Sequence, residues 1–214
     1  MNIFLILKLL LVIFISVLGT KLAAYWLNFL YLKHSNILSY KETIAARSRY
    51  RQLLLPFLLG TIFGWQIIAL SDNAATIILK MICCYFLLLF TFSDFEQEVI
   101  FDHMLLPFAI FGIIFTLTAG LPFFNHLTAA AGGGISFLLL AILTRGGIGG
   151  GDIKLIAALG IWLGTDNLLT LPCIGLLTGG VFAFLLLISK RKKRTDYFAY
   201  GPFFTLTALF YLLF

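Results

Sequence analysis

Apolar segments follow one another along almost the whole chain, and only short polar segments separate them. A helix of about 20 apolar residues can cross the ~30 Å hydrocarbon core of a bilayer. Such a helix satisfies its backbone hydrogen bonds internally, so it is stable in lipid. Only 11% of the residues are charged, whereas a soluble domain carries about 25%. The sequence therefore predicts an all-α, polytopic membrane helix bundle.

We expect about eight transmembrane helices. They are predicted at residues 1–32, 53–70, 74–92, 105–120, 127–144, 153–163, 168–189 and 198–214. The sixth segment is too short to cross the bilayer at roughly 1.5 Å per residue, unless it extends past its ends or the site dips into the membrane. We expect one integrated membrane domain, with N-terminal helices and a short basic loop in residues 1–73 and the membrane core in residues 74–214.

The distribution of basic residues predicts the orientation of these helices. With an outside N-terminus, the cytoplasmic loops are residues 33–52, 93–104, 145–152 and 190–196. The first and last of these loops each carry five Lys or Arg residues, whereas the predicted outside turns carry none. This asymmetry follows the positive-inside rule, so the net charge of +6 does not indicate a nucleic-acid partner. The basic run 190–194 fixes topology and can also bind anionic lipid headgroups.

A glycine-rich segment, residues 146–160, places the carboxylate of Asp152 between a run of glycines and an apolar helix. Gly149, Gly150 and Gly151 lack a Cβ, so they permit a turn and the close approach of an extended peptide backbone. An ionisable group at the membrane edge is costly and is usually retained for function. Asp152 also lies on the same predicted side as the acidic loop 93–104.

Two carboxylates on one side of the membrane can hydrolyse a peptide bond without a metal. One activates water as a general base, and the other donates a proton to the carbonyl oxygen or leaving group. Close approach keeps one carboxyl protonated and the other ionised. Spacing alone leaves four candidate partners for Asp152, which are Asp94, Glu96, Glu98 and Asp102. Asp94 is favoured because it ends an apolar span, while Glu98 and Asp102 could form a solvated helix face.

Three segments resemble motifs of the type IV prepilin peptidases, which are aspartic proteases of the GxGD type. GGGDIKLIAALGIWLG is similar to the second aspartate motif and contains Asp152. SDFEQEVIFDHMLLP is similar to the first, and this places the first catalytic aspartate at Asp94 and a later, noncatalytic aspartate at Asp102. AYGPFFTLTAL is similar to a P-F-G-P-F segment of the family. Ile100 and Phe101 replace the usual Ile-Pro pair, and the resemblance is specific from about residue 74 to residue 214.

The resemblance implies a membrane aspartic endopeptidase that removes the short basic leader of prepilins and pseudopilins. The cut is made at the cytoplasmic face of the bacterial plasma membrane, just before the hydrophobic helix of the substrate. Asp94 and Asp152 would be catalytic. The supporting and substrate-binding residues would be Gly149, Gly150, Gly151, Lys154, Glu96 and Glu98. We expect Glu96 and Glu98 to contact the basic leader, and Lys154 to assist the site, neutralise Asp152 or extend to the membrane interface.

Many members of the family also methylate the new N-terminus with S-adenosylmethionine. Those members carry paired CxxC motifs, which resemble a zinc site, in the loop after the first helix. Here residues 33–52 contain no cysteine. We therefore expect no zinc and no cofactor for proteolysis, and S-adenosylmethionine only if methyltransferase activity is retained. Such trimmed members resemble the competence-pilin peptidases of Gram-positive bacteria.

Two other functions would use the same residues. A small transporter or ion carrier could relay protons or ions through Asp94 and Asp152. The sequence shows no inverted repeat and few other polar residues within the spans, which disfavours this alternative. A pilus-assembly subunit with an inactive site is the other alternative. Helix packing alone would explain the glycines but not the joint presence of both aspartate motifs.

Overall fold

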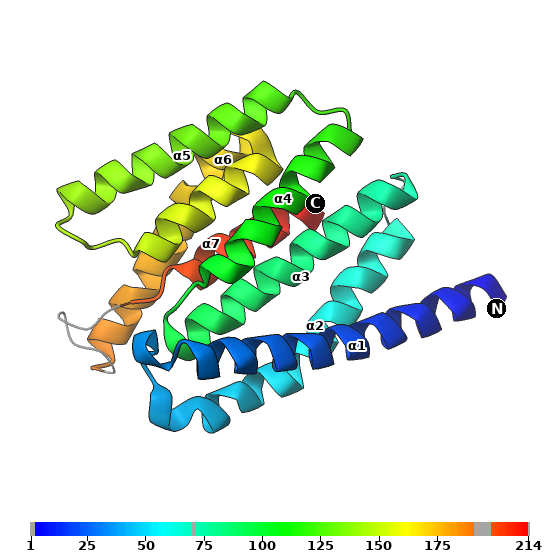
Figure 1. Cartoon of the computed structure of the whole chain (residues 1–214), viewed down its shortest axis with the longest axis horizontal. Helices are drawn as coiled ribbons and strands as arrows, with labels where there is room; N and C mark the ends of the chain where they lie inside the picture. The colour runs from blue at the N-terminus through cyan, green and yellow to red at the C-terminus, as the bar shows by residue number, and fades with distance from the viewer. Residues whose placement is uncertain (1–2, 70–71, 191–197, 214) are drawn as a thin grey trace.

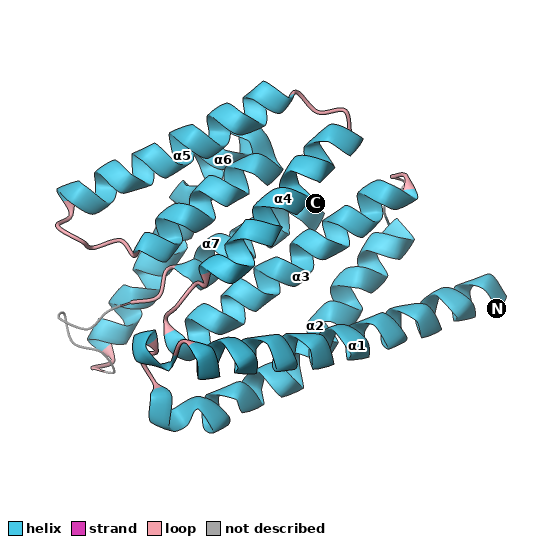
Figure 2. Cartoon of the chain, viewed as in Figure 1, coloured by secondary structure: helices cyan, strands magenta, loops and turns pink. Residues whose placement is uncertain are grey.

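The computed structural model describes residues 3–69, 72–190 and 198–213, and within these residues the fold consists of helices and short connections (Figure 2). The α-helices are α1 (Ile3–Lys33), α2 (Ile44–Ala69), α3 (Ala74–Gln97), α4 (Asp102–Thr118), α5 (Phe123–Leu143), α6 (Gly150–Ile188) and α7 (Gly201–Leu213). Two 3₁₀ turns, Ser35–Ile37 and Lys41–Thr43, connect α1 to α2. Five of these helices are long and apolar enough to cross a membrane. The predicted helical membrane bundle is confirmed.

The long helix α6 is two helical arms joined at Gly164. This residue has φ 68° and ψ −176°, a conformation open to glycine because it lacks a Cβ. Leu168, just after the break, lies beside Gly133 of α5, and Gly179 further along lies beside Tyr200 at the start of α7. The second arm therefore runs back toward the end of the bundle where α6 began. The two arms correspond to the sixth and seventh predicted spans, so the described helices form eight helical segments.

The structure corrects the predicted bounds of two loops. Helix α3 continues through Gln97 and α4 begins at Asp102, so the loop predicted at 93–104 is only residues 98–101. Helix α2 begins at Ile44, so the loop after α1 is also shorter than predicted. In both cases helix continues into polar sequence because tertiary contacts satisfy the polar side chains. Most of the basic run 190–194 lies outside the described residues.

Helix α3 lies in the middle of the bundle, between α2, α4 and α7 (Figure 1). Its buried residues include Cys83, Cys84 and the run Leu87–Phe90. Trp162 of α6 stacks on Phe108 and Phe115 of α4, and its indole N–H donates to the carbonyl oxygen of Phe108 at 3.0 Å. Burial thus fixes α3 and α6, the helices that carry the two aspartates, within one apolar core.

Candidate active site

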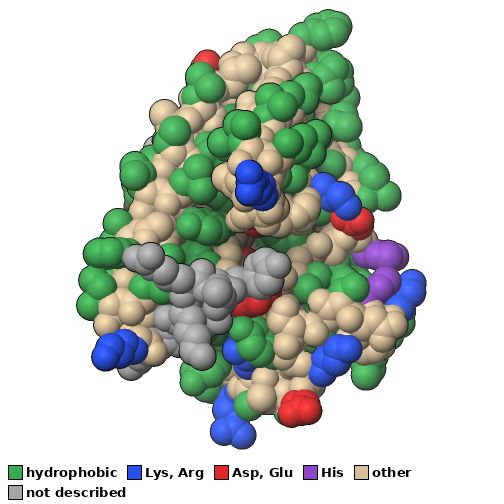
Figure 3. Space-filling view, turned by 90° about the vertical axis from the view of Figure 1, so that its left-hand side faces the viewer, with side chains coloured by type: hydrophobic (Ala, Val, Ile, Leu, Met, Phe, Trp, Pro, Cys, Tyr) green, Lys and Arg blue, Asp and Glu red, His purple; other side chains and the backbone are tan. Residues whose placement is uncertain are grey.

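Several helix ends meet at one end of the bundle, on the left in Figure 1: the C-termini of α1 and α3 and the N-termini of α2, α4, α6 and α7. Gly201, which begins α7, lies against Asp94 near the end of α3. Gly151, which follows the start of α6, lies against Ile100 in the loop after α3. Figure 3 shows this end of the molecule, with acidic atoms at the bottom of a hollow and basic side chains around it.

Asp94 occupies the last turn of α3 and is 6% exposed. Its carboxylate accepts a hydrogen bond from the backbone N–H of Gly201. A helix N-terminus offers free N–H groups and a partial positive charge, which favour an anion. Its Oδ2 atom has no hydrogen-bond partner among the described residues. Asp94 is therefore held by the start of α7 while one oxygen remains available.

Asp152 lies in the first turn of α6, where Gly149 is the N-cap residue. Its carboxylate accepts a hydrogen bond from the backbone N–H of Gly149, three residues earlier. This is the carboxylate half of a capping box, in which the third helical residue bonds back to the N-cap N–H. The GxGD sequence thus forms a helix start that orients its own aspartate. Asp152 is half-buried.

The two aspartates come from helices far apart in the sequence, yet they lie within electrostatic range of each other. The charges of Asp152 and Glu98 both act on the carboxyl group of Asp94. Like charges in a partly buried site cannot both ionise freely, so such a pair can share one proton. The arrangement can supply one general base and one general acid.

A groove of about 480 Å³ opens beside Asp94. Its polar lining includes Glu98, which accepts a hydrogen bond from the Tyr40 hydroxyl at 3.0 Å. The lining residues are Tyr40, Arg47, Tyr50, Asp94, Phe95, Glu98, Phe182, Leu186, Phe198, Ala199, Pro202 and Phe203. Most of the lining is aromatic or aliphatic, so the groove suits an apolar peptide segment with a polar group near Asp94 and Glu98.

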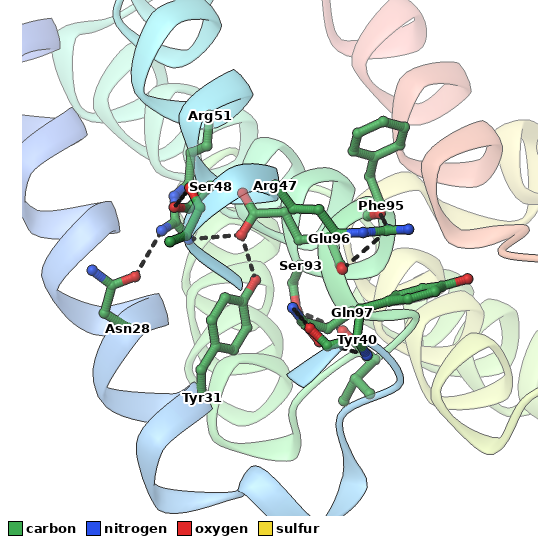
Figure 4. A network of polar contacts seen from close by, with 12 residues as sticks. Asn28, Tyr31, Tyr40, Arg47, Ser48, Arg51, Ser93, Phe95, Glu96 and Gln97 are labelled. Carbon is green, nitrogen blue, oxygen red and sulfur yellow. Dashed lines mark hydrogen bonds and ion pairs between the residues drawn. The ribbon is translucent and has the colours of Figure 1, made fainter. Parts of the chain in front are cut away.

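Glu96 does not lie on an accessible loop, which corrects the expectation that it contacts a leader. Its side chain is 1% exposed and faces away from the groove, into the bundle. The Tyr31 hydroxyl of α1 donates to its Oε2 atom at 2.9 Å, and Arg51 of α2 lies 3.3 Å from the same atom (Figure 4). A buried charge needs such partners, so Glu96 joins three helices.

The other supporting residues differ in their surroundings. Lys154 forms an exposed ion pair with Asp102 at 2.7 Å. A Cβ at Gly150 would meet nothing within 4 Å, so this glycine leaves open space beside Asp152, whereas a Cβ at Gly151 would lie 3.1 Å from Ile100. Sequence reasoning assigned no role to Gly201 or Tyr40. Gly201 could have been found from the sequence, because residues 199–209 resemble a family segment. No motif in the sequence pointed to Tyr40.

Comparisons with known proteins identify similar sequences. The type IV leader peptidase family matches residues 81–186, which include both aspartates. The prepilin leader peptidase/N-methyltransferase of Neisseria gonorrhoeae is 34% identical over 178 residues, which cover 79% of this chain and 58% of that protein. Over these residues the chain is similar to the type IV prepilin peptidases. Enzymes of the same name from Xanthomonas campestris pv. campestris and Escherichia coli K12 are each 29% identical, and the match covers 66% and 58% of this chain.

The chain spans about half the length of these relatives, since the matches cover 58%, 48% and 59% of them. Among solved structures, none matches the chain. Within residues 3–69, 72–190 and 198–213, no three His, Cys, Asp or Glu side chains are grouped closely enough to hold a metal ion.

Proposed function

We propose that this chain is a membrane aspartic endopeptidase that removes the leader peptide of type IV prepilin-like or pseudopilin precursors. The observation that carries the proposal is the meeting of Asp94 and Asp152 at one end of the bundle, beside a groove that Asp94 lines. The names of the relatives support the substrate class. A competence pilin is one substrate of this class.

In the proposed reaction, the ionised aspartate accepts a proton from a water molecule that attacks the scissile carbonyl. The protonated aspartate donates its proton to the carbonyl oxygen. When the tetrahedral intermediate collapses, the aspartate that took the proton from water gives it to the leaving amine, and the other aspartate takes back a proton from the intermediate. The free Oδ2 of Asp94 and the helix-start position of Asp152 suit a pair that exchanges one proton. No metal or cofactor is needed for these steps.

The positive-inside pattern supports a plasma-membrane protein whose active site faces the cytoplasm. Of the two glutamates expected to contact a basic leader, Glu96 is buried and Glu98 lines the groove. Glu98 is therefore the one that we propose contacts the leader. We do not extend methyltransferase activity to this chain, because it spans about half of the relatives that carry that name and its loop at 33–52 contains no cysteine.

The test is to express the chain in membranes with a prepilin that carries a Gly-Phe junction. We expect Asp94→Asn and Asp152→Asn each to abolish cleavage. Asp166→Asn is the matched control, because Asp166 is an exposed aspartate just after the Gly164 break, at the other end of the bundle. Cleavage that survives the change at Asp94 or Asp152 would remove that residue from the catalytic pair.

A further inference from the structure

The last turn of α3, which carries Asp94, ends with carbonyl groups that have no partner within the helix. Arg47, in the first turns of α2, reaches across to them. Its Nη1 atom donates to the carbonyl oxygens of Phe95 at 3.1 Å and Glu96 at 3.3 Å (Figure 4). A cation at a helix C-terminus also interacts favourably with the helix dipole. Arg47 therefore caps the helix end that presents Asp94.

Arg47 is itself held in place by the loop that follows α1. Its guanidinium lies 3.5 Å from the ring centroid of Tyr40. The Tyr40 backbone is fastened to the same turn of α3, because its N–H donates to Oε1 of Gln97 at 3.1 Å and its carbonyl accepts from Nε2 of Gln97 at 3.3 Å. The guanidinium of Arg47 therefore packs its flat face on the Tyr40 ring and donates from its edge to the carbonyl oxygens at the end of α3.

These contacts hold the backbone around Asp94 without using its carboxylate. Gln97 and Glu98 bond to Tyr40, and Glu96 bonds to Tyr31 and Arg51 on the other side of the helix. The Oδ2 atom of Asp94 has no partner among the described residues. The last turn of α3 therefore sets where the Asp94 side chain starts, while Gly201 of α7 contacts the carboxylate itself.

We propose that Arg47 is a positioning residue: it fixes the last turn of α3 and so sets the placement of the Asp94 carboxylate relative to Asp152. The inference rests on the proposed function, because it assigns Arg47 a part in that reaction. Arg47 also lines the groove beside Asp94, so direct contact with substrate is the competing role that an experiment must separate.

The kinetic test compares Arg47→Ala and Arg47→Lys with Arg49→Ala in purified full-length protein. Arg49 is exposed on the same helix, and within the described chain it makes no hydrogen bond or ion pair, so its loss controls for charge. We expect Arg47→Ala to lower kcat by about a hundredfold with KM within about twofold. Lysine keeps the charge but not the planar fork, so Arg47→Lys should recover part of kcat. A raised KM with unchanged kcat would overturn the proposal in favour of substrate contact.

A second measurement does not depend on cleavage. Amide hydrogen exchange in residues 95–98 should be about tenfold faster in Arg47→Ala, as expected when a helix end loses its cap, and unchanged in Arg49→Ala. Unchanged exchange in Arg47→Ala would overturn the proposal whatever the kinetics. If wild type fails to cleave a prepilin while the exchange of Arg47→Ala rises, the proposed function fails and Arg47 still holds the turn.

Discussion

The ammonium group of Lys154 lies 2.7 Å from Oδ2 and 2.8 Å from Oδ1 of Asp102. This ion pair joins the first turn of α6 to the first turn of α4. Lys154 is two residues from Asp152, yet Asp152 accepts its hydrogen bond from the backbone of Gly149 instead. The cation closest to Asp152 in the sequence is therefore bonded to another carboxylate, and the capped start of α6 orients Asp152.

We expect Lys154→Ala to leave cleavage within about threefold of wild type. The side chains of Lys154 and Asp102 are 57% and 66% exposed, and exposed ion pairs contribute roughly 0.2–1 kcal/mol. Asp102→Asn should have a similar effect, and the double variant should add little to either change. Initial rates of leader removal in membranes check this. A loss of more than about tenfold in Lys154→Ala alone would place the ammonium in the reaction.

The arrangement of the helices was largely predictable because hydropathy reports directly on membrane spans. The break at Gly164 is the clearest case, since separate spans were predicted at 153–163 and 168–189 and the structure turns back between them. The ends of α2 and α3 were not predictable in this way. The first turns of α2 and the last turn of α3 are polar. They remain helical because Arg51 of α2 and Glu96 of α3 form an ion pair between the two helices.

The motifs predicted which aspartates lie together but not what surrounds them. Glu96 was expected at a surface because it follows Asp94 in a run of charged residues. Its burial depends on Tyr31 and Arg51, which are 65 and 45 residues away in the sequence, and no local pattern encodes that pairing. The hydrogen bond from Gly201 to Asp94 is hidden for the same reason, because it joins the ends of α3 and α7.

Gly201→Ala should strongly reduce cleavage while the protein still folds. A Cβ at this position would lie 2.6 Å from Oδ2 of Asp94, so the carboxylate must move. Alanine is otherwise well suited to a helix start, and no large loss of stability is expected. We expect a fall of about a hundredfold in kcat, the usual scale for a displaced catalytic group.

Gly180→Ala is the matched control, because a Cβ there would meet nothing within 4 Å. Its cleavage rate and its thermal unfolding midpoint in detergent should stay close to those of wild type. Equal activity in Gly201→Ala and Gly180→Ala would show that the position of Asp94 tolerates the added methyl group, and the close approach of α7 would then have no catalytic role.

Arg51→Ala should destabilise the bundle by about 3–5 kcal/mol, because it leaves the Glu96 carboxylate buried without its counter-charge. Both side chains are 1% exposed. Replacing both residues, as in Arg51→Met with Glu96→Leu, should cost less than Arg51→Ala, since no charge then remains buried. Denaturant unfolding in detergent measures the free energies. A double variant as unstable as the sum of the single changes would show that the two charges act independently.

Gly160→Ala should lower the thermal unfolding midpoint, whereas Gly132→Ala should leave it unchanged or raise it. A Cβ at Gly160 would lie 2.5–2.7 Å from backbone atoms of Ala129 and Ala130, so α5 and α6 would have to separate. Such overpacking costs about 1–3 kcal/mol, which exceeds the gain of about 1 kcal/mol from replacing glycine in a helix. A Cβ at Gly132 meets nothing within 4 Å, so only the gain remains. Opposite shifts in the two variants would show that close backbone contact, and not glycine content, holds the helix that carries Asp152; equal shifts would contradict this.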